Sequence, residues 1–226
     1  MPELWVTQLG RIAYPEALDL QRALHLRRVA GELPDLLLVL EHGPVYTKGK
    51  RTGPGDLPMD ESWYRARGIE VCETDRGGRV TYHGPGQLVA YPIMAVDLVA
   101  DFVHGMEGAI VAALADEGLR AEPRDTPFTG VWAGERKIGS IGVRVRDGVS
   151  MHGLAVNVDN DLEPFEWIVP CGIEHARVTS LSAETGRAPA LPCFRKRLAY
   201  RFADAFGMRQ RLVSLERLKG REAVAA

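Results

Sequence analysis

The stretch that decides the fold is GVWAGERKIGSIGVRVRDGVSMHGLAVNV, residues 130–158. It contains three β-prone segments, Gly130–Ala133, Lys137–Val145 and Val149–Val158, separated by only a few residues. The last connection, Arg146-Asp147-Gly148, contains the Asp-Gly pair that is typical of a hairpin turn. Because connections this short cannot cross over between parallel strands, the stretch predicts an antiparallel three-stranded meander.

The flanking sequence predicts a sheet with helices. We expect strands over Glu3–Gln8, Leu36–Leu40, Ile69–Thr74 and Leu88–Val96, and helices from Pro15 to near Gly31, over Asp101–Glu117 and over Pro192–Phe206. The segment Thr47–Pro58, which contains glycine, proline and charge, is expected to be a surface loop. Since no linker or repeat divides the chain, residues 1–226 predict a single α/β domain with a mixed, largely antiparallel sheet and helices mainly on one face.

Composition excludes several classes of protein. The chain has 226 residues, of which 46% are hydrophobic and 26% charged, as in an ordinary globular protein. A net charge of −2 argues against a nucleic-acid-binding protein, which would carry a basic excess. The N-terminus does not resemble a signal peptide, and the apolar runs are too short to cross a bilayer. We therefore expect no membrane association and a cytoplasmic location.

The cysteines and histidines do not predict a structural or metal-binding framework. The three cysteines, Cys72, Cys171 and Cys193, are widely spaced and include no Cys-x-x-Cys pair. The histidines show no His-Glu-x-x-His or comparable ligand spacing. We therefore expect neither disulfides nor a metal or other cofactor.

Cys171 is a candidate nucleophile. It lies between Pro170, which fixes its own φ angle, and Gly172, which leaves space beside the sulfur. An apolar run, Trp167-Ile168-Val169, precedes it. The alternative, and the commoner fate of such a residue, is a buried cysteine that acts as a small hydrophobe.

Lys137 is the candidate partner for this thiol. It opens a predicted strand with two glycines, Gly139 and Gly142, which weaken a strand unless another group must approach its backbone. A lysine here can stabilise a thiolate and relay protons if burial lowers its pKa. The alternative is a solvated lysine that follows a turn.

Arg76–Gln87 contains four glycines in twelve positions. It is neither a Walker A motif nor a Rossmann fingerprint, because the required lysine and the glycine spacing are missing. Its glycines could instead allow the backbone itself to line a groove for a narrow ligand. Gly153-Leu154-Ala155 could line the same groove. The alternative is a plain glycine-rich hairpin.

Three motifs together resemble one family. Arg76–Leu88, Lys137–Gly142 and Pro170–Gly172, in this order, strongly resemble the lipoyl(octanoyl) transferases of the biotin/lipoate protein ligase-like superfamily. The resemblance covers most of the chain. It implies the α/β fold of that superfamily and an acyltransferase that moves an octanoyl group in lipoate biosynthesis.

The resemblance also implies roles for individual residues. Cys171 is expected to form an acyl-thioester and Lys137 to activate it. The substrate contacts are expected at Arg76, Gly77, Gly78, Arg79, Val80, Thr81, Tyr82, His83, Ser140, Ile141, Gly142, Gly153, Leu154 and Ala155. The implied donor is octanoyl-acyl carrier protein. The implied acceptors are the lipoyl domains of 2-oxoacid dehydrogenase complexes and the glycine cleavage H protein, and we expect a monomer.

The sequence leaves other functions open, as well as the roles of His83 and of several arginines. An ATP-dependent lipoate or biotin protein ligase would keep the lysine without needing Cys171, a scaffold would bind without turnover, and a thioesterase would release free octanoate. His83 could orient substrate or assist proton transfer. Five arginines either offer a basic surface to acidic partner proteins or are dispersed and solvated: Arg76, Arg79, Arg144, Arg146 and Arg177.

Overall fold

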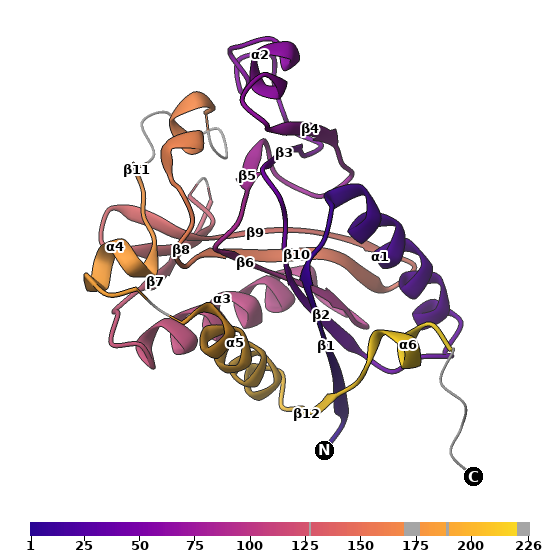
Figure 1. Cartoon of the computed structure of the whole chain (residues 1–226). Coiled ribbons are helices and arrows are strands. Elements are labelled where there is room, and N and C mark those ends of the chain that lie inside the picture. Colours follow the sequence, from indigo (N-terminus) through magenta and orange to yellow (C-terminus); the bar gives the residue numbers. More distant parts are fainter. Residues whose placement is uncertain (127, 170–176, 189, 221–226) are drawn as a thin grey trace.

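The strands of the main sheet come from nearly the whole length of the chain (Figure 1). The computed structural model describes residues 1–126, 128–169, 177–188 and 190–220. The strand order is β12-β1-β2-β6-β10-β9-β8-β7, and β11 pairs with β9. The strands are β1 (Glu3–Arg11), β2 (Leu36–Glu41), β6 (Gln87–Ile93), β7 (Glu122–Arg124), β8 (Gly130–Ala133), β9 (Arg136–Arg146), β10 (Val149–Asn157), β11 (Arg177–Val178) and β12 (Arg209–Leu212).

The pairing confirms a mixed, largely antiparallel sheet. Strands β8, β9 and β10 form the predicted antiparallel meander, and β10 continues antiparallel to β6 and then to β2. Among the described strands of this sheet, parallel pairs occur where β1 meets β2 and β12 and where β11 meets β9. The predicted strands and the three predicted helices are all present, with ends that shift by a few residues.

Helices cover both faces of this sheet. Alternate residues of β2 point to opposite faces, so Leu37 and Val39 belong to one core while Leu36, Leu38 and Leu40 belong to another. The first core is closed by α3 (Val99–Ala115) and α5 (Leu191–Ala205), and the second by α1 (Tyr14–Val29) and α6 (Leu215–Leu218). The expectation that helices lie mainly on one face is therefore wrong, because a strand buried on both faces needs a cover on each side.

A second, smaller sheet lies beside the main one (Figure 1). Its order is β4-β3-β5, with β3 (Val45–Lys48), β4 (Glu70–Glu73) and β5 (Thr81–His83). It packs with α2 (Glu61–Arg65) and the 3₁₀ helix η1 (Glu163–Trp167) around a largely aromatic core, which includes Tyr46, Tyr64, Val80, Tyr82 and Phe165 and which we call the aromatic core. The predicted surface loop Thr47–Pro58 is thus partly wrong, because Thr47 and Lys48 belong to β3 and Thr47 is fully buried.

The glycine-rich segment joins the two sheets. Strand β5 pairs with β3 in the small sheet, whereas β6 pairs with β2 and β10 in the main sheet. Gly84-Pro85-Gly86 connects them, so the hairpin alternative for Arg76–Gln87 is wrong. None of the helices in the described residues is long and apolar enough to span a membrane.

Candidate active site

A cavity of about 320 Å³ lies where the main sheet meets the loops of the small sheet. The candidate residues that line it are Arg76, Gly78, Arg79, Thr81, His83, Lys137, Ser140, Ile141, Gly142, Gly153, Leu154 and Ala155. Residues from three distant parts of the sequence are thereby brought together. Gly77, Val80 and Tyr82 do not line the cavity, and the last two are buried in the aromatic core.

One side of the cavity is formed by the meander. Ser140, Ile141 and Gly142 on β9 lie opposite Ala155, Leu154 and Gly153 on β10, so the two predicted segments are neighbours in one ladder. We call these six residues, together with Lys137, the sheet wall. A Cβ on Gly153 would lie 2.2 Å from the Ala90 carbonyl oxygen and 2.5 Å from Pro92 Cδ. Only glycine allows β6 to approach β10 this closely.

Lys137 belongs to the sheet wall through its side chain. The residue is only 5% exposed, and its Nζ donates a hydrogen bond to the Thr129 carbonyl at 2.8 Å. The aliphatic stem passes over Gly130, where a Cβ would lie 2.8 Å from the lysine Cε. The alternative of a solvated lysine is therefore wrong. The side chain is buried, and Gly130 leaves the room it needs to reach the rim of the cavity.

The opposite side is formed by loops. Arg76 is buried, and its guanidinium donates to the Thr47 carbonyl at 2.5 Å, to the Thr47 hydroxyl at 2.8 Å and to the Gly77 carbonyl at 3.0 Å. The Gly77 amide donates to the Val143 carbonyl at 2.9 Å, which joins this loop to β9. We call the loop residues Arg51, Arg76, Gly78 and Arg79, together with Thr81 at the start of β5, the loop wall.

The segment 49–58 packs against the loop wall. Backbone amides of Lys50 and Arg51 donate to the carbonyls of Arg76 and Gly78, both at 3.0 Å. The buried carboxylate of Asp56 accepts from Arg79 Nη1 at 3.0 Å and from the Gly53 amide at 2.8 Å.

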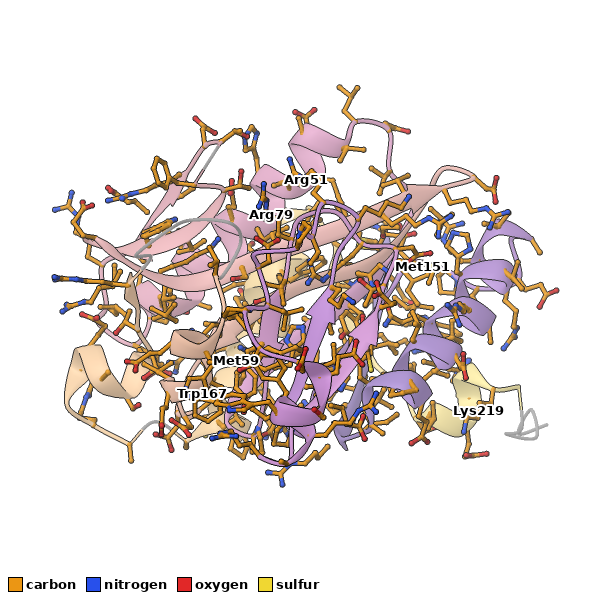
Figure 2. All side chains as sticks on the ribbon, turned by 90° about the horizontal axis from the view of Figure 1, so that it is seen from above. Arg51, Met59, Arg79, Met151, Trp167 and Lys219 are labelled. Carbon is orange, nitrogen blue, oxygen red and sulfur yellow. The ribbon has the colours of Figure 1, made fainter. Side chains whose placement is uncertain are left out.

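Arginine side chains give this end of the cavity its positive charge. Figure 2 shows the side chains of Arg51 and Arg79 near each other. The five arginines proposed as a basic surface differ in their surroundings. Arg76 is buried, whereas Arg144 pairs with Asp75 and Arg146 with Asp147. Arg76 therefore cannot belong to an exposed basic surface together with the other four arginines.

Two buried histidines lie where the sheets meet. His42 Nδ1 donates to the Ile12 carbonyl at 2.8 Å, and the Tyr91 hydroxyl donates to His42 Nε2 at 2.7 Å. His83 Nδ1 lies 2.7 Å from Gln87 Oε1. Burial lowers the pKa of His42 to about 4 and that of His83 to about 3. Both imidazoles are consequently neutral at neutral pH.

His152 is a cavity residue that the sequence did not reveal. It has a positive φ of 58°, which is uncommon for a residue with a side chain. Its Nε2 lies 2.7 Å from Asp75 Oδ1, and burial, followed by the charges of Arg76 and Arg144, lowers its pKa to about 3. The other lining residues outside the prediction are Tyr14, Arg51, Tyr91, Thr126 and Thr129. None forms a recognisable motif, because Tyr14, Arg51 and Tyr91 come from separate parts of the chain and the two threonines lie in one short connection between β7 and β8.

Cys171 lies outside the described residues. The described chain ends before it at Val169, whose amide donates to the Asp56 carbonyl at 3.0 Å, and resumes in β11, where Val178 pairs with Lys137. The other thiols are poor candidates for a nucleophile in this cavity, since neither lines it. Burial, followed by the charges of Glu70 and Glu61, raises the pKa of the Cys72 thiol. No group of three potential metal ligands occurs among the residues that the structure describes.

Known proteins resemble this chain in sequence and in fold. The model of the lipoyl protein ligase A/B catalytic domain family matches residues 13–203. An octanoyltransferase of Chloroflexus aurantiacus is 45% identical over 222 residues, which cover 95% of this chain and 99% of the relative. An octanoyltransferase of Thermobifida fusca is 49% identical over 191 residues, which cover 78% of this chain and 77% of the relative.

Among solved structures, a bi-partite lipoate protein ligase from Thermoplasma acidophilum, described with its E2 lipoyl domain, has a TM-score of 0.76. It is 18% identical, and the match covers 97% of this chain and 90% of that chain. This likeness confirms the fold expected from the motifs.

Proposed function

Because the chain belongs to the lipoyl protein ligase A/B catalytic domain family and is an acyltransferase, we propose that it transfers an octanoyl group in lipoate biosynthesis through a thioester on Cys171. The observation that carries the proposal is the buried Lys137, which is held at the rim of a cavity lined by Ser140–Gly142 and Gly153–Ala155. The proposed catalytic unit is the whole of residues 1–226, acting as a monomer in the cytoplasm.

The first half-reaction transfers the acyl group to the enzyme. The Cys171 thiolate attacks the carbonyl carbon of the octanoyl thioester on the phosphopantetheine arm of acyl carrier protein. A C–S bond forms, the original C–S bond breaks, and a proton goes to the departing thiol. Because one thioester replaces another, this step is close to balanced in free energy.

The second half-reaction transfers the acyl group to the acceptor. The ε-amine of a lysine, on a lipoyl domain of a 2-oxoacid dehydrogenase complex or on the glycine cleavage H protein, attacks the acyl-enzyme. A C–N bond forms and the C–S bond to Cys171 breaks. Conversion of a thioester into an amide is downhill and drives the cycle, so the transfer proceeds without ATP. Splitting the transfer into two steps in this way is covalent catalysis.

Lys137 has two roles in this scheme. A free thiol has a pKa of about 8.5, so only a few per cent of it is thiolate at neutral pH. The Lys137 ammonium stabilises the thiolate by Coulomb attraction, and its buried position strengthens that attraction relative to bulk water. A lysine can also give a proton to the departing thiol and accept one from the attacking amine.

The two walls of the cavity suit the two parts of the donor, which are its octanoyl chain and its acidic carrier protein. Apart from Lys137 and Ser140, the sheet wall consists of glycine, alanine and aliphatic residues, which suit the octanoyl chain. The loop wall has Arg51 and Arg79 at the same cavity, where cationic side chains attract an acidic carrier protein or its phosphodiester. Because salt screens the attraction between solvent-exposed charges, raising the ionic strength should increase the KM for the donor protein.

The decisive experiment is intact-mass measurement after incubation with octanoyl-acyl carrier protein. The wild type should gain one octanoyl group, Cys171→Ala should gain none, and a lipoyl domain should discharge the adduct. Cys193→Ala, which removes an exposed thiol on α5, is the matched control and should be acylated like the wild type. Transfer that requires ATP and free octanoate, with no adduct on the wild type, would favour a ligase instead.

A further inference from the structure

A row of buried side-chain amides leads away from the imidazole of His83. His83 Nδ1 lies 2.7 Å from Gln87 Oε1, Gln87 Nε2 lies 2.9 Å from Asn157 Oδ1, and Asn157 Nδ2 lies 3.0 Å from the Thr179 carbonyl. All four residues are buried. We call Gln87 and Asn157 the amide relay. It crosses from the end of β5 through β6 and β10 to the residue that follows β11.

Two backbone carbonyls fix the direction of every hydrogen bond in this row. A carbonyl can only accept, so Asn157 presents its NH₂ group to Thr179 and its oxygen to Gln87. The Gln87 NH₂ group donates both to that oxygen and to the Tyr82 carbonyl at 3.1 Å, which uses both of its hydrogens. Gln87 Oε1 must therefore accept from His83 Nδ1, and the imidazole must carry its hydrogen on that atom.

The consequence is a bare nitrogen at the cavity. The His83 ring lines the cavity, and its Nε2 makes no hydrogen bond with the described part of the chain. Tyr14 stacks on the ring, with centroids 6.2 Å apart and planes inclined by 8°, and the hydrogen bond to Gln87 holds the ring in this orientation. Since burial lowers the pKa of His83 to about 3, the ring stays neutral and Nε2 keeps its lone pair at neutral pH.

We propose that His83 Nε2 accepts a hydrogen bond from the attacking amine of the acceptor lysine, and that Gln87 and Asn157 are positioning residues that hold the tautomer able to do so. This inference rests on the proposed function. The reacting atoms of the donor thioester carry no N–H, because the nearest amide of a phosphopantetheine arm lies beyond an ethylene spacer. The acceptor amine is the reactant with an N–H at the reacting atom, so His83 should act in the second half-reaction.

The bonds and protons of that step balance without His83 changing its protonation state. The neutral amine attacks the thioester carbonyl carbon, the C–N bond forms, and the electron pair of the broken C–S bond returns to Cys171. One amine proton goes to that sulfur, through Lys137, and restores the thiol. His83 holds a remaining N–H and thereby aims the nitrogen lone pair at the carbonyl carbon, which is a contribution of orientation.

The test separates the two half-reactions in single turnovers. Acylation is followed by intact mass with octanoyl-acyl carrier protein, and discharge is followed by adding a lipoyl domain to the isolated acyl-enzyme. We expect His83→Phe, which keeps an aromatic ring against Tyr14, to slow discharge by about 10- to 100-fold through lost orientation and acylation by less than about threefold. Equal slowing of both steps, or of neither, would overturn the inference.

Gln87 variants test the positioning role. Gln87→Leu removes the acceptor for Nδ1–H and should slow discharge selectively. Gln87→Glu restores an acceptor, but its carboxylate raises the pKa of His83, so discharge should recover relative to Gln87→Leu at alkaline pH and fall as the pH is lowered. A merely structural role would give no such pH dependence, and its absence would contradict the proposal.

Gln21→Leu is the matched control. Gln21 is equally buried and also hydrogen-bonds within the fold, accepting from the His152 amide at 2.8 Å, but it does not line the cavity. It should affect both half-reactions by similar factors. The same selective loss in Gln21→Leu as in Gln87→Leu would overturn the positioning role. A wild type that forms no acyl-enzyme at all would instead refute the proposed function, and the inference with it.

Discussion

The two walls of the cavity are built in different ways. In the sheet wall, residues such as Ile141 and Leu154 are fixed by an antiparallel backbone ladder that continues into the rest of the main sheet. In the loop wall, Arg76 and Arg79 are fixed by side-chain contacts with Thr47 and Asp56. One wall therefore depends on the spacing of a continuous ladder, whereas the other combines the side-chain contacts of two arginines with single backbone hydrogen bonds, such as that from the Gly77 amide to the Val143 carbonyl.

The two walls are therefore sensitive to different substitutions and conditions. A backbone ladder tolerates changes of exposed side chains, but it does not tolerate a side chain where two strands already touch. Charged contacts at a partly exposed site are weakened by salt and by protonation. Substitutions in one wall should therefore affect the other only weakly, through contacts such as that of Gly77 with Val143 on β9.

The largest effect is expected at Lys137, the charged member of the sheet wall. Lys137→Met removes both the cation and the proton relay and should lower kcat by about 100- to 10,000-fold. Lys137→Arg keeps a cation that stays protonated, so it should support the thiolate but not relay protons. Octanoyl transfer is measured in steady state, and circular dichroism checks the fold. An arginine variant as active as the wild type would contradict the proton relay.

A side chain at Gly153 should break the sheet wall. Gly153→Val places a Cβ where the Ala90 carbonyl lies 2.2 Å away, and both groups belong to the ladder, so strands β6 and β10 must separate. We expect the free energy of unfolding to fall by about 3 kcal/mol, measured by urea denaturation. Gly108→Ala is the control, because Gly108 lies within α3 with nothing near the added methyl group. It should be neutral or stabilising.

The sequence predicted the sheet wall well because its determinants are local. The Asp147-Gly148 turn fixes the register that places Ser140 opposite Ala155. Apolar runs of the right length located β2 and β6, and the family resemblance is confirmed by the family model. Such features need only neighbouring residues to be recognised.

The loop wall could not be predicted in the same way. The stretch from Arg76 to Gln87 spans two sheets, and nothing local to it indicates that β5 leaves one sheet before β6 joins the other. His152 reaches the cavity through a backbone angle that its sequence neighbours do not predict. Asp56, in a segment that reads as a plain connection, contacts Arg79 across 23 residues. These contacts depend on tertiary packing rather than on pattern.

Acid should destabilise the junction between the walls. His42 and His83 have pKa values of about 4 and about 3 in the fold, against about 6.5 when unfolded. Between the folded and unfolded pKa values, the unfolded chain binds more protons than the folded chain. The free energy of unfolding therefore has its full value above about pH 6.5 and falls as the pH is lowered. Each imidazole contributes up to about 1.4 kcal/mol per pH unit.

Urea unfolding at several pH values between 7.5 and 5 measures this dependence. The His42→Asn variant lacks one of the histidines whose pKa is lowered and keeps His83 and His152, so its stability should fall less steeply with acid than that of the wild type, whatever its stability at pH 7.5. Identical slopes for the two proteins would show that His42 does not contribute to the acid sensitivity.

The smallest effect is expected at Asp56, which supports the loop wall. Asp56→Asn loses the ion pair with Arg79 but keeps an oxygen for the Gly53 amide. The Arg79 side chain is 45% exposed, so water can solvate the released guanidinium, and the loss of stability should be about 0.5–1 kcal/mol. Since the lost interaction is a partly exposed ion pair, the difference from the wild type should shrink in high salt. Asp60→Asn, at an exposed position with no side-chain cap bond, is the control. A loss for Asp56→Asn as large as that for Gly153→Val would show that the loop wall is coupled to the sheet ladder and does not depend on its charged contacts alone.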